Sequence, residues 1–487
     1  MRVFFIGVCG TAMGNAAILL KKMGHDVAGS DAGVYPPMSD VLKDAGIYLF
    51  EGFEAEEMIG WRPDRVVVGN AVSRGNPQVE NLLAKRQIPF VSLPQLIGED
   101  LIGNRPSIVV AGTHGKTTTT ALTAFSLYDL GISPGYLVGG VPLDLPSGNE
   151  LGDFSAPFVI EGDEYDSAFF DKRSKFIHYR PRILILNNLE FDHGDIFRDL
   201  QDIARSFSHL LRIVPSNGYI LMNGDDPNLR DLPDAPWTNT ITVGVNQNND
   251  LVIDQFEEDA TGSRFRLVWK GELVDQINWS MNGLFNARNL TMAILSSCLS
   301  QKLQYADENT LDNPFSGKTI PDFSKCRGVK RRQEQLFDSP ALTILSDFAH
   351  HPTAIAGALE SLHARWPDRK IVACFEPRSN TAVTNVFQDR FAQSLALADL
   401  ALIGQVHRAE RIPEQERIDP AQMIQFICSK GKQGEAFSSN QELGAYLKER
   451  EFAALGEKLL VVFFSNGSFD GVIQEFVQLA ERNFVPF

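Results

Sequence analysis

The sequence has few cysteines and no long apolar run. Its 487 residues include five cysteines, which are scattered without a C-x-x-C pair. This argues against a disulfide framework or a zinc site and is typical of a reducing compartment. No segment approaches the roughly 20 apolar residues of a membrane-spanning helix, and "MRVFFIGVCG" passes into a strand-and-turn pattern instead of a secretory leader. We therefore expect a cytoplasmic protein without disulfides or a membrane anchor.

Positive charge is also scarce. The chain has 45 lysines and arginines against 61 aspartates and glutamates, which gives a net charge of −16. Nucleic acid and anionic membrane surfaces would be repelled by most of such a molecule, so neither is an expected partner. An anionic ligand must then be held by local groups. The sequence makes no prediction of oligomeric state.

The length and the apolar pattern predict three α/β domains in tandem. Short apolar strands such as "VFFIGV" and "RVVVGNA" alternate with helical segments, which indicates parallel sheets with crossover helices. Residues 236–281, which include "TNTITVGV" and "SRFRLVWKGEL", are instead predicted to form antiparallel strands.

Two polar stretches mark the expected domain boundaries. "GEDLIGNRPS" is punctuated by glycine and proline, and "YADENTLDNPFSGKTIPDFSK" lacks the regular apolar pattern of its neighbours. We place the boundaries near 104 and 325. The predicted domains are residues 1–104, 105–325 and 326–487.

The segment "VVAGTHGKTTTT" opens the second domain with a phosphate-loop pattern. Gly112 and Gly115 allow backbone N–H groups to wrap phosphate oxygens, Lys116 can reach the terminal phosphates and Thr117 can hold Mg²⁺. The following helix presents its positive end to the same anion. The match to G-x-x-x-x-G-K-[ST] is partial because Val110 occupies the first glycine position, and an ordinary threonine-capped helix is the alternative.

Two acidic clusters follow apolar strands of this domain, in "IEGDEYD" and "NNLEFDH". The carboxyl ends of parallel strands meet at one edge of a sheet, so Glu161 and His193 are candidates to hold one or two divalent ions beside the phosphate loop. By itself, each cluster could be a solvated turn.

The first domain begins with a glycine-rich turn, "GVCGTAMG". Gly7, Gly10 and Gly14 suit a tight turn whose helix approaches a phosphate, and Asp31 ends the next strand, where a carboxylate can bind ribose hydroxyls. Cys9 replaces the second glycine of G-x-G-x-x-G, so a close-packed turn without a ligand is the alternative.

Polar residues near the second boundary have two interpretations. Asn286 and Asn289 in "GLFNARNL" could be a helix cap and a solvent-facing residue, or they could bind a base edge. The run Lys330, Arg331 and Arg332 could be a solvated loop, or it could bind an anion.

A further strand end in the third domain, "SDFAHHPTA", places Asp347 beside two histidines. The segment has neither the serine or cysteine of a hydrolase nor a zinc-ligand spacing. These residues are therefore predicted to bind and position a ligand.

In this order, the motifs resemble those of the Mur ligases, the ATP-dependent enzymes that build the peptide stem of bacterial peptidoglycan. The family's phosphate loop has the form G-T-x-G-K-T, which "GTHGKT" matches at every position. The resemblance extends over nearly the whole chain, through "GSD", "EGDEYD", "NNLEFDH", "NARN", "GVKRR", "SDFAHHP" and "FEPRSNT". It implies a Rossmann-like UDP-sugar domain, a P-loop ATP domain and a Rossmann-like C-terminal domain.

Within the family, the resemblance implies the branch that joins UDP-N-acetylmuramate to an amino acid or peptide. "CGTAMG", "GNAVSRGNP", "GVKRR" and "FEPRSNT" are more similar to members that attach the murein tripeptide L-Ala-γ-D-Glu-meso-diaminopimelate during peptidoglycan recycling. Attachment of L-alanine is the alternative. The implied reaction uses ATP and Mg²⁺ and passes through an acyl phosphate.

The resemblance also implies roles for individual residues, with Lys116, Glu161 and His193 as the catalytic set. The ATP-binding set is Gly112, Thr113, His114, Gly115, Lys116, Thr117, Thr118, Asn286, Asn289, Arg332 and Asp347. The UDP-sugar set is Gly7, Cys9, Gly10, Thr11, Ala12, Met13, Asp31, Asn70 and Ser73. The metal ligands are Thr117, Glu161 and His193, and the peptide-binding residues are His351 and Arg378.

The chain departs from the family in three places. "DIFRDLQDIARSFSHLLR" has no lysine, so we expect no carbamylated lysine. Phe348 and Ala349 stand where this branch often has the tyrosine and glycine of D-Y-G-H-H, so the phenol of that tyrosine is missing here. Ser379 and Asn380 follow Arg378, where the alanine-adding members have more arginine.

Two other classes of protein could use parts of this pattern. A nucleotide-dependent binding module would need the phosphate loop but not two further domains with polar strand ends. An NAD-dependent oxidoreductase would use the first glycine-rich turn and Asp31 but would leave the phosphate loop unexplained.

Overall fold

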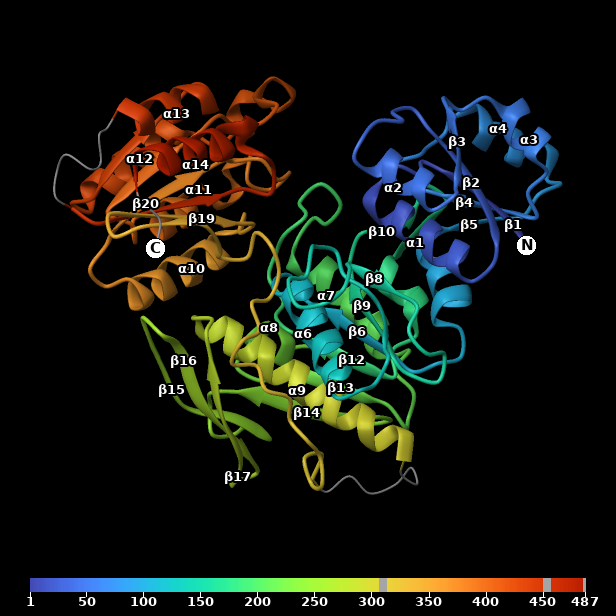
Figure 1. Ribbon diagram of the computed structural model, residues 1–487, viewed down its shortest axis with the longest axis horizontal. Helices are drawn as coiled ribbons and strands as arrows, with labels where there is room; N and C mark the ends of the chain where they lie inside the picture. The colour runs from blue at the N-terminus through green and yellow to red at the C-terminus, as the bar shows by residue number, and fades with distance from the viewer. Residues whose placement is uncertain (306–312, 450–456, 485–487) are drawn as a thin grey trace. The chain divides into compact units, whose positions relative to one another are not determined.

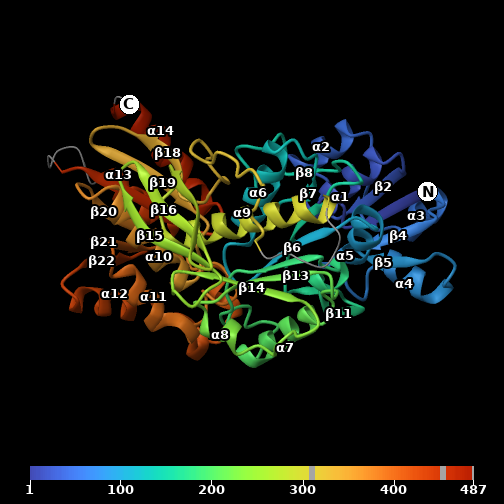
Figure 2. The ribbon, with the colours of Figure 1, turned by 90° about the horizontal axis from the view of Figure 1, so that it is seen from below.

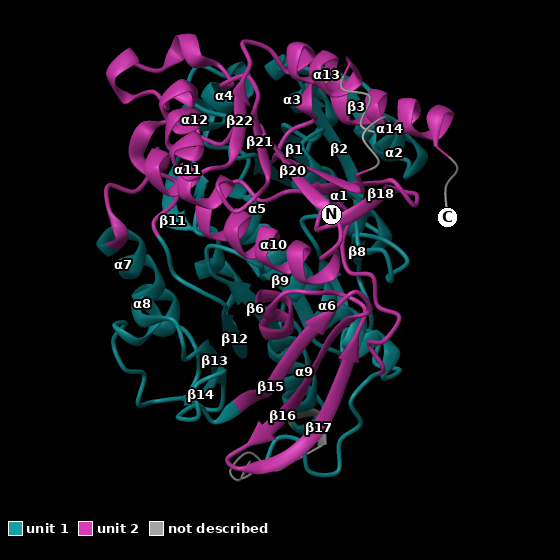
Figure 3. Ribbon diagram, turned by 90° about the vertical axis from the view of Figure 1, so that its left-hand side faces the viewer, with its two compact units in different colours: residues 1–190, 201–251, 290–321 teal, residues 191–200, 252–289, 322–487 magenta. Residues whose placement is uncertain are grey.

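The structure, a computed structural model, describes residues 1–305, 313–449 and 457–484. The first part of the loose stretch before the second predicted boundary, residues 306–312, lies outside these ranges. The chain forms two compact units: residues 1–190, 201–251 and 290–321, and residues 191–200, 252–289 and 322–487 (Figure 3). This division does not test the boundaries near 104 and 325, which stay predictions.

The first unit begins with a five-stranded parallel sheet in the order β3-β2-β1-β4-β5 (Figure 1). Helix α1 packs beside α2 and α3 beside α4. The inner strands are apolar along almost their whole length, as expected where helices cover both faces of a parallel sheet. The elements are β1 (Arg2–Ile6), α1 (Thr11–Lys22), β2 (Asp26–Asp31), α2 (Met38–Asp44), β3 (Tyr48–Glu51), α3 (Ala55–Trp61), β4 (Arg65–Val68), α4 (Pro77–Lys85), β5 (Phe90–Ser92) and α5 (Leu93–Leu96).

Seven neighbouring strands of a ten-stranded sheet follow in the order β14-β13-β12-β6-β9-β7-β8. They run parallel except at the antiparallel pair β7 and β8. The strands are β6 (Ser107–Ala111), β7 (Gly135–Leu137), β8 (Asn149–Glu150), β9 (Phe158–Gly162), β12 (Ile183–Leu186), β13 (Tyr219–Asn223) and β14 (Asn239–Gly244). Residues 105–305 also form α6 (Lys116–Asp129), β10 (Asp166–Ala168), β11 (Asp171–Ser174), α7 (Leu200–Leu211), α8 (Pro227–Arg230) and α9 (Leu284–Tyr305).

The prediction of antiparallel strands over residues 236–281 is wrong for β14, which pairs in parallel with β13. Residues 224–238 contain α8 and are long enough to cross over between two parallel strands. The prediction is confirmed for β16 (Gly262–Trp269) and β17 (Glu272–Trp279), an antiparallel pair in the second unit that follows β15 (Leu251–Asp259).

The second unit also contains the C-terminal sheet, in the order β18-β19-β23-β20-β21-β22. Its strands are parallel except for β18. Alternate residues of the buried strands face two apolar cores, one with α10, α11 and α12 and the other with α13 and α14, which lie on opposite sides of the sheet in Figure 2. The elements are β18 (Glu334–Asp338), β19 (Leu342–Asp347), α10 (Pro352–Arg365), β20 (Lys370–Phe375), α11 (Gln388–Leu395), β21 (Leu400–Ile403), α12 (Pro420–Ser429), β22 (Gln433–Ala436), α13 (Asn440–Glu449), β23 (Leu459–Phe464) and α14 (Val472–Asn483).

The sequence prediction of three α/β domains with largely parallel sheets agrees with these elements. In the described ranges, no helix has both the length and the apolar character that crossing a bilayer would require.

Candidate active site

The phosphate loop connects β6 to α6 at the carboxyl end of β6. Gly112 has φ of +133°, and a Cβ at this position would lie 3.0 Å from the backbone N and O of Asn188. Gly115 has φ of +79° and immediately precedes the first residue of α6. A side chain at either position would strain the backbone, so the two glycines allow the tight turn that leads into the helix.

The segment after β12 holds the phosphate loop in place. Asn188 Oδ1 accepts a hydrogen bond from the backbone N of His114 at 2.7 Å. The Thr113 hydroxyl accepts from the backbone N of Glu190 at 2.9 Å and donates to its carbonyl at 3.1 Å. The strand end in "NNLE" therefore meets the phosphate loop at one edge of the sheet, as the sequence predicts.

Lys116 is the first residue of α6, and its ammonium has two partners. Nζ donates to the carbonyl of Gly112 at 2.8 Å and pairs with the carboxylate of Glu164 at 2.9 Å. Burial by itself would lower the pKa of Lys116, but the nearby carboxylates of Glu164 and Asp163 outweigh it and raise the pKa above its ordinary value. The ammonium therefore stays charged and is held at the mouth of the loop.

Two oxygen-bearing side chains, those of Thr117 and Glu161, meet beside Lys116. The Thr117 hydroxyl donates to Glu161 Oε2 at 3.0 Å, and Glu161 Oε1 accepts from the backbone N of Gly139 at 2.6 Å. The parallel register of β6 and β9, with Val110 opposite Glu161, brings these groups together. A hydroxyl and a carboxylate in contact, next to a phosphate loop, fit the ligand preference of Mg²⁺.

His193 belongs to the second unit, in the short segment of residues 191–200. Its φ of +56° is unusual for a residue with a side chain, and Asp192 Oδ1 accepts its backbone N–H at 2.7 Å. The same oxygen accepts from the Thr381 hydroxyl at 2.7 Å. Burial by itself would raise the pKa of Asp192. The positive charges that the rings of His193 and His350 can carry, together with these hydrogen bonds, outweigh burial and lower the pKa. A charged, buried Asp192 therefore fixes the backbone that presents His193.

His351 also contacts this segment. It is buried at the N-cap of α10, where its ring accepts from the backbone N of Thr353 at 3.4 Å, and its Nε2 lies 3.3 Å from the carbonyl of Phe191. Arg378, the other predicted peptide-binding residue, is partly exposed and lies 3.2 Å from Glu376.

The predicted adenine-side and ribose residues are all buried. Asn286 is the third residue of α9, so it is not an N-cap, and its amide donates to the carbonyl of Asn282 at 2.7 Å. Asn289 is 7% exposed, which contradicts the interpretation of a solvent-facing residue. Asp347 ends β19, and its two oxygens accept from the backbone N of Gln333 and Ala349 at 2.9 and 2.7 Å.

Arg332, the last residue of the basic run, brings a positive charge close to Asp347. The guanidinium of Arg332 lies over the ring of Phe348, 4.7 Å from its centre. Burial raises the pKa of Asp347, and the charge of Arg332 opposes that shift. Arg332 and Asp347 thus lie together within the second unit.

The predicted UDP-sugar residues occupy the carboxyl edge of the first sheet. Asp31 accepts from the backbone N of Cys9 at 2.9 Å and of Gly33 at 3.3 Å, so it holds the turn after β1. Asn70 and Ser73 are exposed residues after β4, the strand beside β1. The other members of this set lie in the turn or in the first turn of α1: Gly7, Gly10, Thr11, Ala12 and Met13.

The sequence did not indicate two residues that hold Lys116 and the segment of His193 in place. Glu164 pairs with Lys116, and Thr381 pairs with Asp192. Both lie inside quoted motifs, "EGDEYD" and "FEPRSNT", but nothing in a single sequence indicates which polar residue of a motif faces the site.

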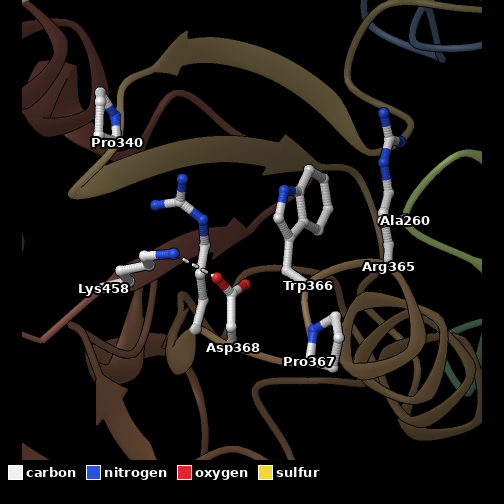
Figure 4. Close-up of a pocket in the computed structure, with 8 residues that line it drawn as sticks. Ala260, Pro340, Arg365, Trp366, Pro367, Asp368 and Lys458 are labelled. Atoms are coloured by element: carbon white, nitrogen blue, oxygen red, sulfur yellow. Dashed lines mark hydrogen bonds and ion pairs between the residues drawn. The ribbon is translucent and has the colours of Figure 1, made fainter.

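A pocket of about 470 Å³ lies elsewhere in the second unit (Figure 4). It is at the amino edge of the C-terminal sheet, just before β19, β20 and β23 begin. Ligands of open α/β sheets bind at the opposite, carboxyl edge, so this pocket is not the candidate active site. Its lining residues are Ala260, Pro340, Arg365, Trp366, Pro367, Asp368, Arg369 and Lys458.

Three domain families of known proteins match most of the chain. Residues 2–102 match the "Mur ligase family, catalytic domain", residues 110–297 the "Mur ligase middle domain", and residues 331–463 the "Mur ligase, glutamate ligase domain". Members of this family are ATP-dependent ligases.

Individual relatives are similar over almost their full length. The chain is 39% identical to the UDP-N-acetylmuramate–L-alanyl-gamma-D-glutamyl-meso-2,6-diaminoheptandioate ligase of Escherichia coli, over 98% of this chain and 97% of that protein. It is 30% identical to a UDP-N-acetylmuramate–L-alanine ligase of Desulfitobacterium hafniense, over 92% of this chain and 94% of that protein. The crystal structure of a murein peptide ligase from Psychrobacter arcticus is 34% identical, with a TM-score of 0.66 and full coverage of both chains. Together with the phosphate loop and the three matched domains, these similarities show that the chain belongs to the Mur ligase family.

Proposed function

We propose that this protein is an ATP-dependent ligase that joins the carboxylate of UDP-N-acetylmuramate to the free amine of L-Ala-γ-D-Glu-meso-diaminopimelate. The observation that supports this most strongly is the 39% identity, across 98% of the chain, to a relative whose name states these substrates. The geometry of the phosphate loop supports the use of ATP. Its place would be peptidoglycan recycling in the cytoplasm.

The residues around Lys116 suit transfer of a phosphoryl group. Lys116 would stabilise negative charge that develops on the transferred oxygens, which is usually the largest contribution to this chemistry. Thr117 and Glu161 would hold Mg²⁺, and His193 would hold a second ion. When bound, Mg²⁺ would neutralise charge on the phosphates.

The proposed reaction has two steps. A carboxylate oxygen of UDP-N-acetylmuramate attacks the terminal phosphorus of ATP and ADP leaves, which gives an acyl phosphate. The peptide amine then attacks the carbonyl carbon, loses a proton and displaces phosphate, which leaves an amide. The buried hydrogen bond between Asp192 and Thr381 would fix the segment of His193 during these steps.

The other predicted sites complete the proposal. The carboxyl edge of the first sheet, with the turn that Asp31 holds, would bind the UDP-sugar. Asn286, Asn289, Arg332 and Asp347 would bind the adenosine side of ATP, and His351 and Arg378 would lie near the peptide. The division into domains 1–104, 105–325 and 326–487 remains part of this proposal.

L-alanine is the second candidate acceptor. It is favoured by the 30% identity to an alanine ligase, which also extends over most of the chain. The higher identity to the tripeptide relative favours the peptide.

Release of ADP tests the proposed function. We expect rapid ADP release only when ATP, Mg²⁺, UDP-N-acetylmuramate and the tripeptide are all present, with one UDP-linked amide product for each ADP. The measurement is coupled ADP detection together with mass spectrometry of the product. Equal ADP release without UDP-N-acetylmuramate, or no amide with either acceptor, would show that the protein is not this ligase.

A further inference from the structure

The pocket in Figure 4 lies at the amino edge of the C-terminal sheet, and the proposed reaction assigns no role to it. Its volume of about 470 Å³ is in the range of sites for small ligands. Residues 365–369, which connect α10 to β20, form most of its lining, together with Pro340 before β19 and Lys458 before β23. The pocket therefore has the size and the enclosure of a binding site.

The lining carries more positive than negative charge, although the protein as a whole is acidic. It has three cations, Arg365, Arg369 and Lys458, and one carboxylate, that of Asp368. Two of the cations have counter-charges within the protein. Lys458 Nζ lies 2.6 Å from Asp368 Oδ2, and Arg369 Nη2 lies 3.8 Å from Asp338 Oδ1. The positive charge that remains is that of Arg365.

Arg369 holds the wall of the pocket in place. Its Nη1 donates to the carbonyl of Leu459 at 3.1 Å, and its Nη2 donates to the carbonyl of Ser339 at 2.7 Å. Leu459 begins β23 and Ser339 comes shortly before β19, so one guanidinium connects the starts of two neighbouring strands. The pocket is thus formed without a ligand, which lowers the cost of binding one.

The guanidinium of Arg365 lacks such partners. In the described ranges it donates to no oxygen and has no carboxylate within ion-pair distance, and it lies over the ring of Trp366, 4.4 Å from the ring centre. Burial lowers the pKa of Arg365, and the charge of Asp338 opposes that shift. A cation in the last turn of α10 favours the helix dipole, but that effect does not require burial. A partly buried cation with unused donors is costly, and an external anion would offset that cost.

Trp366 supplies a second unused donor. Its indole Nε1 donates to none of the residues that the structure describes. In contrast, Trp237 and Trp279 donate to the carbonyls of Val214 and Cys326 at 3.2 and 2.8 Å. Figure 4 shows the side chains of Arg365 and Trp366 next to each other. An acceptor group in the pocket could therefore meet both donors.

The arrangement of donors indicates which anion the pocket would accept. Arg365, Trp366 and Lys458 offer N–H groups on three separate side chains of the lining, since the contact with Asp368 leaves N–H groups of the Lys458 ammonium unused. Donors from three sides suit a tetrahedral phosphate group, which has several terminal oxygens, better than a planar carboxylate. The volume of the pocket also leaves room for the rest of a small phosphate ester.

We propose that this pocket binds the phosphate group of a small molecule, with Arg365 as its main anchor and Trp366 and Lys458 as further donors. A free phosphate ion and a nucleoside monophosphate both carry this group. None of the residues proposed to hold ATP takes part, and Arg365 lies roughly 21 Å along α10 from His351 at its N-cap. The pocket is a second anion site, and its assignment does not depend on which acceptor the ligase uses.

Fluorescence titration of the full-length protein tests this assignment. The difference between wild type and Trp366→Phe isolates the signal of the pocket, because the two proteins share every other tryptophan and all other anion sites. At constant ionic strength, we expect a saturable difference signal with sodium phosphate, with uridine 5′-monophosphate or with both, and none with sodium acetate. Saturation by the monophosphate alone would identify a phosphate ester as the ligand, and saturation by phosphate would show that the ion is sufficient.

Two charge variants should change the affinity in opposite directions. Arg365→Gln should weaken binding about ten- to hundredfold, because it removes charge-assisted hydrogen bonds. Asp368→Asn should strengthen binding about two- to tenfold, because it removes a negative charge from the lining and releases Lys458. A residue with only a structural role would not produce this increase.

The matched control is Arg205→Gln, which removes a 65% exposed arginine on α7 in the first unit and should leave the affinity unchanged. Thermal unfolding shows whether each variant is folded, and if Arg365→Gln is not, the increase expected for Asp368→Asn still decides. The assignment would be overturned if neither phosphate compound gives a saturable difference signal, if acetate binds equally well, or if folded Arg365→Gln binds as tightly as wild type.

Discussion

Lys116→Ala should reduce kcat for ADP release by about 10²- to 10³-fold, the loss typical when one preorganised group that stabilises transition-state charge is removed. The ammonium lies at the phosphate loop, 2.8 Å from the carbonyl of Gly112. Initial-rate measurements at saturating ATP and UDP-N-acetylmuramate give kcat directly.

Two variants separate this role from a structural one. Removal of Lys116 leaves Glu164 buried without its cation, which could destabilise the fold. The double variant Lys116→Ala with Glu164→Gln removes both charges and should be as inactive as the single variant. Lys172→Ala removes an exposed lysine of the same domain and should retain full activity. Near-normal turnover of a folded Lys116→Ala protein would show that the phosphate site is elsewhere.

Glu161→Gln should raise the Mg²⁺ concentration for half-maximal activity by about 10- to 100-fold, because the metal site loses a negatively charged ligand. The amide preserves the shape of the side chain: its oxygen can accept from the backbone N of Gly139 while its NH2 group donates to the Thr117 hydroxyl, so the protein should fold normally. An Mg²⁺ titration of ADP release measures this shift.

The control for this variant is Glu150→Gln. Glu150 lies in the same domain, and its carboxylate pairs with Lys22 at the surface. Its Mg²⁺ dependence should match that of the wild type. If Glu161→Gln lowers kcat without changing the Mg²⁺ requirement, Glu161 acts on the reacting groups and is not a metal ligand.

Local patterns predicted the parts of the site that lie on adjacent strands. The apolar strand before "GTHGKT" indicates β6, and the glycines and lysine identify the loop after it. Glu161 could be placed beside this loop because parallel strands end at one edge, and its contact with Thr117 confirms that placement. The alternation of strands and helices likewise predicted the three α/β domains.

Other features depend on partners that are distant in the chain. The hydrogen bond of Asp192 joins it to Thr381, and the ion pair of Lys116 joins it to Glu164, so no local pattern indicates either pair. The direction of β14 depends on a crossover through α8, which is too short to have a clear helical pattern. Asn289 is buried because of tertiary packing around α9, which its own helix sequence does not indicate.

The choice of acceptor tests the central claim most directly. In a competition between the tripeptide and L-alanine, with ATP, Mg²⁺ and UDP-N-acetylmuramate in excess, mass spectrometry of the UDP-linked products gives the ratio of the two kcat/KM values. We expect a ratio of at least about 100 in favour of the tripeptide, because binding energy from the parts of a substrate that lie away from the reacting amine raises kcat/KM, and L-alanine lacks these parts. A ratio near one, or a preference for L-alanine, would contradict the account.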